Sequence, residues 1–241
     1  MKLIISIFLF ITYSFSLNLQ IIDVNITSIN KNQATIATGN VQIGQSGIIT
    51  HTFTNNEKMI LGYGVVTSTD SNSSNIKLIF DDILPQDAIP TTNIEPSVGD
   101  NFVLNHLYDT ALLIVPNNEV EQKIKNAFYG LKYIETDILA GYLKLEKTPA
   151  PSLKLFQKFA KQNNIGLLLF VVEKKLHIVD VISLKNIYSF DITYNDTTTN
   201  LPFHTNVEKI NTGLFDFFKE ESIKDYHKYY TKLLGLNNDG K

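Results

Sequence analysis

The chain has 241 residues, of which 44 % are hydrophobic and 19 % charged, and its formal net charge is −3. This is the mixture of a globular protein, and it excludes a chain that is disordered throughout. The slightly negative charge gives no general attraction to nucleic acid or to anionic lipid. The sequence contains no cysteine, which excludes disulfides, thiolate catalysis and cysteine zinc sites, and all 21 of its basic residues are lysines.

The first sixteen residues, 1–16, have the pattern of a secretory signal peptide that is cleaved from the mature protein. Lys2 precedes an apolar run, Leu3–Ile11, that is too short to span a bilayer comfortably. Ser14 and Ser16 stand at the −3 and −1 positions of a signal-peptidase site. The alternatives are a buried first strand and an uncleaved N-terminal anchor. Because no later segment is long and apolar enough for a membrane helix, the sequence predicts an exported protein of the bacterial periplasm or cell surface.

Residues 17–104 are expected to form a small all-β domain that includes a proline-rich connector. Its apolar, threonine-rich segments are separated by asparagine- and glycine-rich turns about ten residues apart, which is typical of a small barrel or sandwich. The expected strands are 19–29, 34–39, 47–54, 59–69 and 75–80. Gly62 and Gly64 fall inside one of these strands and indicate a bulge or a barrel corner.

The connector covers Asp81–Asp100. Its prolines each remove a backbone donor and force the preceding residue towards extended geometry, so the segment is neither a helix nor a central strand. These prolines are Pro85, Pro90 and Pro96. We expect the connector to lie over the surface of the β domain through its isoleucines, which are Ile83, Ile89 and Ile94.

Residues 105–200 are expected to form an α/β layer domain. A short apolar strand at 110–116 precedes three segments with helical spacing at 117–131, 136–147 and 150–164, and three strands follow within 165–192. Each helix begins at a residue whose side chain can cap it. These caps are Asn117 or Asn118, then Thr136 or Asp137, then Ser152, and Gly130 is the stop of the first helix.

Residues 201–241 are expected to be a helical segment from about Asn206, with a break near Gly213 and a short flexible tail. Its aromatic residues crowd beside lysines: Phe215, Phe217, Phe218, Tyr226, Tyr229 and Tyr230 beside Lys219, Lys224, Lys228 and Lys232. One interpretation is a docking helix for a partner. We favour the other, a helix whose aromatic face packs on the α/β domain, because aromatic stripes at helical spacing are usually core. Together the segments predict an α+β protein: a small all-β barrel or sandwich, an α/β layer domain and a C-terminal helix.

The residues that could carry chemistry form no motif. The five histidines are not spaced as metal ligands on a helix; they are His51, His106, His177, His204 and His227. The stretch "DSNSSN", Asp70–Asn75, lacks the glycine and glutamate of a calcium loop and is expected to be a hairpin turn. The serine in "GQSG", Gly44–Gly47, lies between strands and is expected to be part of a turn. The sequence therefore predicts no catalytic residue, no metal and no cofactor, and a protein that is not an enzyme.

Several blocks resemble a known family. They are "DDILPQDAIPTTNIEPSVGD" (81–100), "LYDTALLIVPN" (107–117), "LFQKFAKQNNIGLLLFVV" (155–172) and "KLHIVDVISLK" (175–185). In content and order they resemble the bacterial plasminogen-binding protein N-terminal domain family, over about residues 18–220. The resemblance implies a secreted or surface-exposed protein of Gram-negative, host-associated bacteria that captures host plasminogen.

The resemblance also implies how capture would work. Kringle modules of plasminogen recognise a lysine ammonium and a carboxylate at a fixed separation, with an aromatic trough for the alkyl stem. Lys241 ends the sequence after "NNDG" and offers both charges on one residue. The hypothesis is that Lys241 binds a kringle, with Lys228 and Lys232 as weaker helpers. The alternative is a periplasmic structural or scaffold protein of an envelope or flagellar assembly, whose partners are envelope proteins. Neither reading has nucleic acid as a partner.

Overall fold

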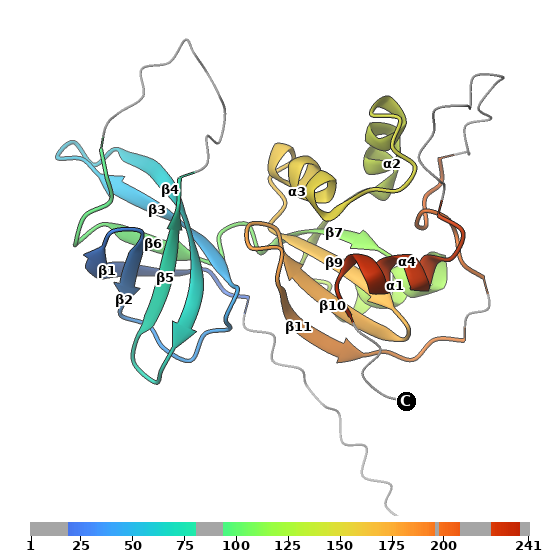
Figure 1. The fold of residues 1–241 in the computed structure, drawn as a ribbon, viewed down its shortest axis with the longest axis horizontal. Helices are drawn as coiled ribbons and strands as arrows, with labels where there is room; N and C mark the ends of the chain where they lie inside the picture. Colours follow the sequence, from blue (N-terminus) through green and yellow to red (C-terminus); the bar gives the residue numbers. More distant parts are fainter. Residues whose placement is uncertain (1–18, 81–93, 196–197, 208–222, 237–241) are drawn as a thin grey trace, which may run out of the picture.

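The computed structural model of the protein describes residues 19–80, 94–195, 198–207 and 223–236 (Figure 1). These residues form a six-stranded barrel and, beside it, a five-stranded sheet covered by helices. The predicted α+β fold class is confirmed, and the all-β part is a barrel. The predicted signal segment, residues 1–16, lies outside the described residues, as does the part of the connector at 81–93.

The barrel consists of antiparallel strands in the order β1-β2-β5-β4-β3-β6, and β6 closes it by pairing with both β1 and β3. The strands are β1 (Ile22–Asn30), β2 (Gln33–Ile36), β3 (Ser46–Thr52), β4 (Lys58–Thr69), β5 (Ser74–Ile79) and β6 (Asn101–Leu104). Side chains alternate along each strand, so one set fills the interior. That interior contains Ile26, Ile36, Ile49, Val66, Ile76, Phe102 and Leu104.

Two glycines make room for the ring of Phe102, the largest side chain inside the barrel. A Cβ atom at Gly64 would lie 2.7 Å from this ring, and one at Gly47 would lie 2.8 Å from it. The pairing of β3 with β4 shifts register between Gly62 and Ile60, so the predicted bulge is present beside Gly62. The described part of the connector, 94–100, contains no helix or strand, as expected.

The second unit is a mixed sheet in the order β11-β10-β9-β7-β8. Its elements are β7 (Thr110–Ile114), α1 (Asn118–Ala127), β8 (Lys132–Ile134), α2 (Thr136–Leu145), α3 (Leu153–Gln162), β9 (Leu167–Val172), β10 (Lys175–Asp180), β11 (Asn186–Asp191) and α4 (Tyr226–Leu233). β7 pairs in parallel with β8 and β9, and β9, β10 and β11 are antiparallel. The middle strand, β9, is buried along its whole length, which explains its unbroken apolar sequence.

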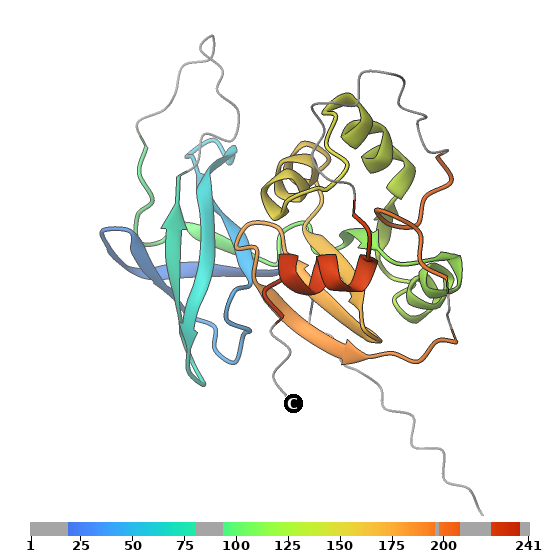
Figure 2. The same cartoon turned by 45° about the vertical axis from the view of Figure 1, so that its right-hand side comes forward.

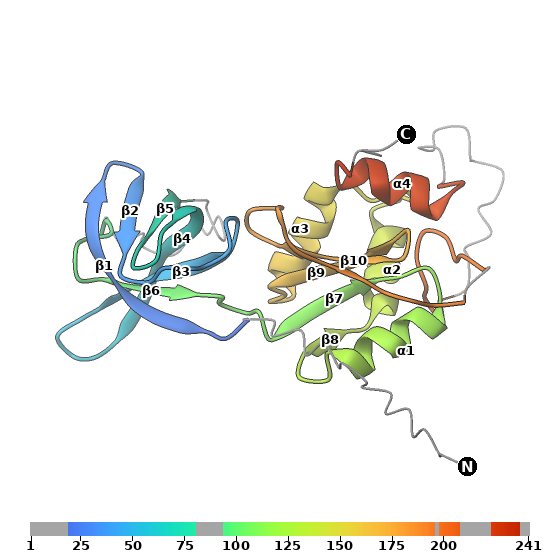
Figure 3. The same cartoon turned by 90° about the horizontal axis from the view of Figure 1, so that it is seen from below.

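Helices cover both faces of this sheet (Figures 2 and 3). Alternate side chains of β7 point to opposite faces: Ala111 and Leu113 pack with Ile124 of α1, whereas Leu112 and Ile114 pack under the other helices. That other layer consists of α2, α3 and α4, and Phe156 lies near its centre. Within the described residues, no helix is both long and apolar enough to cross a membrane.

The helix starts agree with the predicted caps at two of three places. Asn117 accepts a hydrogen bond from the Val120 N–H and Ser152 accepts one from the Leu155 N–H. The cap position of α2 is Glu135, which makes no side-chain cap bond, so the prediction of Thr136 or Asp137 was wrong. Both residues lie in the first turn, where they bind another part of the chain.

Two further expectations need correction. The short strand β8 was not predicted, because three residues in the pattern Lys-Tyr-Ile carry no readable periodicity. The C-terminal helix was expected from Asn206, but residues 206–207 lie in a bend and α4 begins at Tyr226. The aromatic residues Phe215, Phe217 and Phe218 lie outside the described residues.

A buried polar cluster joins the barrel to the sheet. The carboxylate of Asp180, at the end of β10, is fully buried and accepts hydrogen bonds from Ser46 Oγ at 2.5 Å and Tyr108 OH at 2.9 Å. Its other oxygen accepts from the Ser183 N–H, and Ser183 Oγ donates to the carbonyl oxygen of Gly44 at 2.7 Å. Residues of both units therefore meet at one carboxylate, called here the Asp180 junction.

Candidate functional site

The predicted binding residues fall into two groups. Lys228 and Lys232 lie one turn apart on α4, and both are exposed. Because residues four apart share one face of a helix, their ammonium groups leave the same side of α4. Within the described part of the chain, neither ammonium has an ion pair. Lys241 lies outside the described residues.

The opposite face of α4 is anchored by buried tyrosines, as the preferred interpretation of its aromatic residues predicted. The hydroxyl of Tyr226 donates to the carbonyl oxygen of Ile114 at 2.9 Å, and that of Tyr230 donates to Pro202 at 3.1 Å. Burial raises the pKa of both phenols well above the ordinary value, so both remain neutral donors. Tyr230 also packs against the ring of Phe170 in the central strand. α4 is thus a fixed platform with lysines on its outer side.

The start of α4 also places a carboxylate beside these lysines. Asp225 is the cap residue, and its side chain accepts a hydrogen bond from the Lys228 N–H at 3.0 Å. It is exposed, like Lys224 before it. One turn of helix therefore presents an acidic and a basic group together on the surface.

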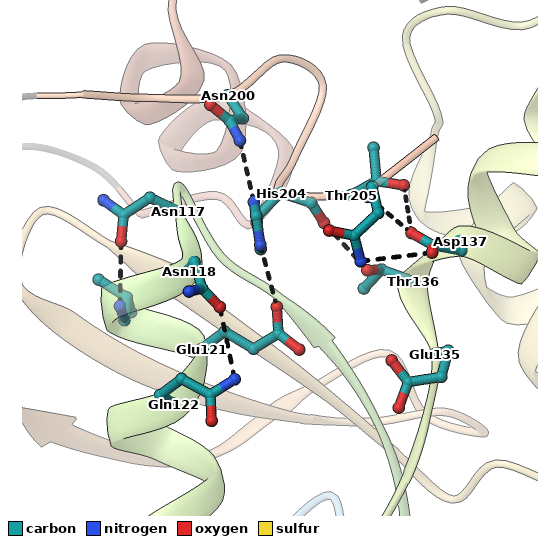
Figure 4. A network of polar contacts seen from close by, with 12 residues as sticks. Asn117, Asn118, Glu121, Gln122, Glu135, Thr136, Asp137, Asn200, His204 and Thr205 are labelled. Carbon is teal, nitrogen blue, oxygen red and sulfur yellow. Dashed lines mark hydrogen bonds and ion pairs between the residues drawn. The ribbon is translucent and has the colours of Figure 1, made fainter. Parts of the chain in front are cut away.

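The carboxyl edge of the parallel strands is the usual ligand site of open α/β sheets. Here it is occupied by a segment of the chain itself, residues 198–207, called here the strap (Figure 4). The N–H of Asn200 donates to Pro116 O at 2.7 Å and the N–H of His204 donates to Val115 O at 2.8 Å. Phe203, between them, is fully buried. The strap therefore lies directly after the end of β7 and fills the space above it.

The strap is also bound by the first turns of α1 and α2. Asn117 Nδ2 donates to the carbonyl oxygen of Thr198 at 3.1 Å, and Thr136 Oγ1 donates to that of His204 at 3.0 Å. Asp137 accepts from Thr205 Oγ1 at 2.6 Å and from the Asn206 N–H at 2.8 Å. These bonds hold the pKa of Asp137 below its ordinary value, with the Thr205 hydroxyl the largest cause. The N-terminal ends of α1 and α2, where an anion could otherwise bind, therefore bind the strap.

One of the five histidines, His204, lies in the strap. Its Nδ1 accepts from Asn200 Nδ2 at 2.9 Å, which leaves Nε2 to face Glu121 at 3.4 Å (Figure 4). Glu121 is also paired with Lys125 at 2.6 Å. All of these contacts are internal to the chain, so the cluster serves to hold the strap on α1.

The other chemical candidates make structural contacts. His51 pairs with Asp100 at 2.8 Å, and His177 lies 3.1 Å from the Ser189 hydroxyl. The carboxylate of Asp70 accepts from Asn72 N and Ser73 N within the hairpin turn that joins β4 to β5, which confirms the turn and lowers the pKa of Asp70. Among the described residues no group of three histidine, aspartate or glutamate side chains is arranged to hold a metal ion.

The expectation that the serine of the "GQSG" stretch lies in a turn was wrong, because this serine begins a strand. Ser46 is the first residue of β3, and its hydroxyl donates to Asp180, 134 residues further along the chain. The Asp180 junction was missed altogether, because a single aspartate at the end of an apolar strand looks like an ordinary strand end. A signal that could have found it is the absence of a basic residue next to Asp180 in "HIVDVI".

The fold and the filled carboxyl edge define a two-unit α+β protein, a closed barrel followed by an α/β layer, with charged surface helices. The family model described as plasminogen-binding protein pgbA N-terminal matches residues 21–234, so the chain belongs to this family. The chain is 23 % identical over 196 residues to the plasminogen-binding protein PgbA of Helicobacter pylori strain 26695, and 22 % identical to that of strain J99. These alignments cover 80 % of this chain and 42 % and 43 % of the relatives, so the chain spans about two fifths of the curated relatives it matches.

Proposed function

We propose that this chain is an exported, non-enzymatic binding protein that captures plasminogen through lysine side chains: Lys228, Lys232 and Lys241. Membership of a family named for plasminogen binding supports the partner. The observation that carries the lysine mode is the outer face of α4, where two exposed lysines stand on a helix anchored by Tyr226 and Tyr230.

The chemistry of α4 suits a lysine-binding kringle. Such a module needs an ammonium and a carboxylate at a fixed separation, and Asp225 and Lys228 supply both within one helical turn. Because the helix is anchored, binding orders little beyond the lysine side chains themselves, which limits the entropy cost of association. Lys241 enters the proposal from the sequence alone and forms a separate arm of the experiment.

A non-enzymatic role is supported by the strap. It fills the edge at which open α/β sheets bind ligands, and the buried polar groups there bind one another. The proposal therefore places function on the outer surface of the molecule.

The test is binding of the full chain to immobilised plasminogen, with 6-aminohexanoate as competitor. The chain with both Lys228→Gln and Lys232→Gln is expected to bind several-fold more weakly, and deletion of Lys241 is expected to remove most of the remaining capture. A matched control replaces Lys31 and Lys77, exposed lysines of the barrel, by glutamine and is expected to bind like the parent.

Binding that resists 6-aminohexanoate, or that is unchanged in all the lysine variants, would rule out the lysine mode. Export is tested separately by protease accessibility on intact cells. Cleavage of the chain on intact cells supports a surface-exposed binding protein, whereas protection until the outer membrane is opened supports the periplasmic scaffold role.

A further inference from the structure

The outermost residues of α2 are apolar. Ile138 and Leu145 are seven residues apart, on one side of the helix, and are 54 % and 84 % exposed. Between them a Cβ atom at Gly141 would meet nothing within 4 Å. The helix already buries Leu139 and Leu143 in the core on its opposite side. Among the described residues nothing covers this outer stripe, which we call the α2 crest.

The two helices that share a core cluster with α2 have exposed lysines. In α3, Lys154 and Lys158 are exposed and lie four residues apart, opposite the buried Phe156 and Phe159. The ammonium of Lys158 lies over the Tyr142 ring of α2, whereas Lys161 faces Tyr63 of the barrel. In α4 the outward positions are Lys228 and Lys232. Lys147 follows the cap residue of α2, Glu146. All three helices contribute buried residues to the same core cluster of the sheet. The apolar crest is thus flanked by Lys158 of α3 and by Lys147 in the turn after α2.

Of these lysines, Lys158 is neutralised by an acidic group of the layer. Glu146 pairs with Lys158 at 3.2 Å, and Asp137 is bound to the strap. Asp225 caps α4. Within the described residues, Lys147 and Lys154 have no ion pair. The whole chain has a net charge of −3, so the positive charge of this layer reflects segregation on the surface and not the overall composition.

We propose that the outer face of the α2–α3–α4 layer binds anionic lipid bilayers, with Ile138 and Leu145 entering the interface and the lysines at the headgroups. A convex apolar stripe flanked by lysines combines the two forces that hold peripheral proteins on membranes, apolar burial and attraction to anionic lipid. A lipid surface deforms around such a crest and needs no complementary groove. This interaction is additional to plasminogen capture and uses Lys147 and Lys154, which that proposal does not involve.

The test is cosedimentation of the full chain with vesicles of phosphatidylcholine and phosphatidylglycerol, compared with phosphatidylcholine alone, at low and high salt. Binding is expected only with the anionic vesicles and is expected to weaken with salt. Two double variants are each expected to bind about tenfold more weakly, or not at all. They are Ile138→Gln with Leu145→Gln, and Lys147→Glu with Lys154→Glu. The matched controls, Ile60→Gln with Val98→Gln and Lys31→Glu with Lys77→Glu, lie on the barrel and are expected to bind like the parent.

Three outcomes overturn the proposal. The first is no binding to anionic vesicles, or equal binding to neutral ones. The second is a loss of plasminogen capture, without any effect on vesicles, in the Ile138→Gln, Leu145→Gln variant, which would make the crest a protein-docking surface. The third is a melting temperature several degrees lower for that variant, because the crest would then be buried within the chain itself. Measuring plasminogen capture by the Lys147→Glu, Lys154→Glu variant distinguishes a failure of this proposal from a failure of the function proposed above.

Discussion

At the scale of single residues, Asp180 is a carboxylate buried without a cation. Its hydrogen-bond donors are neutral: Ser46, Tyr108 and the N–H of Ser183. Burial raises the pKa of Asp180, and the hydrogen bonds from Ser46 and Ser183 oppose the rise only in part. For a carboxyl group whose folded-state pKa is raised, the stabilising contribution is complete below the unfolded value and is lost as the pH rises through the folded value.

We therefore expect the Asp180→Asn variant to gain free energy of unfolding relative to the parent as the pH rises from about 4 through the folded pKa. Asp180→Ala removes the acceptor from three buried donors and is expected to cost about 3 kcal/mol or more. Urea denaturation across this pH range measures both. Asp191→Asn, at a side chain that is 90 % exposed, is the control. A parent and an Asp180→Asn variant with parallel pH profiles would contradict the expectation.

At the scale of elements, α4 is stable because of what it packs against. It has only eight residues, too few to be stable alone in water. Its buried side is aromatic: Tyr226 and Tyr230 lie with ring centroids 4.7 Å apart, and both hydroxyls bind carbonyl oxygens of distant segments. One of these carbonyls belongs to the strap, so α4 and the strap stabilise each other.

Removing one of these hydroxyls tests this dependence. Tyr226→Phe leaves the Ile114 carbonyl oxygen without its partner and is expected to lower the free energy of unfolding by about 1–2 kcal/mol. Hydrogen exchange of the α4 amides should accelerate with it. Tyr129→Phe, at a ring that is 90 % exposed, is expected to change neither quantity. Equal stability of the two variants would show that the buried hydroxyl contributes nothing.

At the scale of the whole molecule, the described residues form three hydrophobic cores, one in the barrel and one on each face of the sheet. Polar contacts join the barrel to the sheet. The Asp180 junction is reinforced by the Asn105 N–H, which donates to Ser46 O at 2.8 Å, and by Lys161 of α3, whose ammonium lies 5.5 Å from the Tyr63 ring centroid in β4. Gly44 fits closely at this boundary, because a Cβ atom there would lie 2.9 Å from the Lys185 Cβ.

We expect these contacts to make the barrel and the sheet unfold as one unit. In native-state hydrogen exchange, the amides of Ile49 in β3 and Leu169 in β9 should then report the same opening free energy. In the Ser46→Ala, Ser183→Ala variant the two should separate, because the two serine hydroxyl links of the junction are lost and only the Tyr108 hydroxyl still bridges Ser46 N and Asp180. Two distinct opening free energies already present in the parent would refute the coupling.

Local patterns identified most elements. Asn117 and Ser152 cap helices where their side chains and the following apolar spacing indicated, and the apolar run from Leu167 is a buried strand. Failures occurred where distant contacts decide the structure. Thr136 and Asp137 look like caps, yet their side chains bind the strap about 68 residues away in sequence. β8 exists only because it pairs with β7. For the candidate site, the sequence identified Lys228 and Lys232 as binding residues, but it did not show how they are oriented on α4.

The sequence by itself determined the order and type of the main elements, because helical and strand periodicity and capping depend on residues a few positions apart. The family model described as plasminogen-binding protein pgbA N-terminal also matches the sequence, over residues 21–234. Only the tertiary structure decided that β6 closes the barrel, that the strap fills the carboxyl edge, and that Asp180 meets Ser46. Each of these depends on contacts between groups that are far apart in the chain. Such contacts stabilise the protein only once folding has buried the groups together.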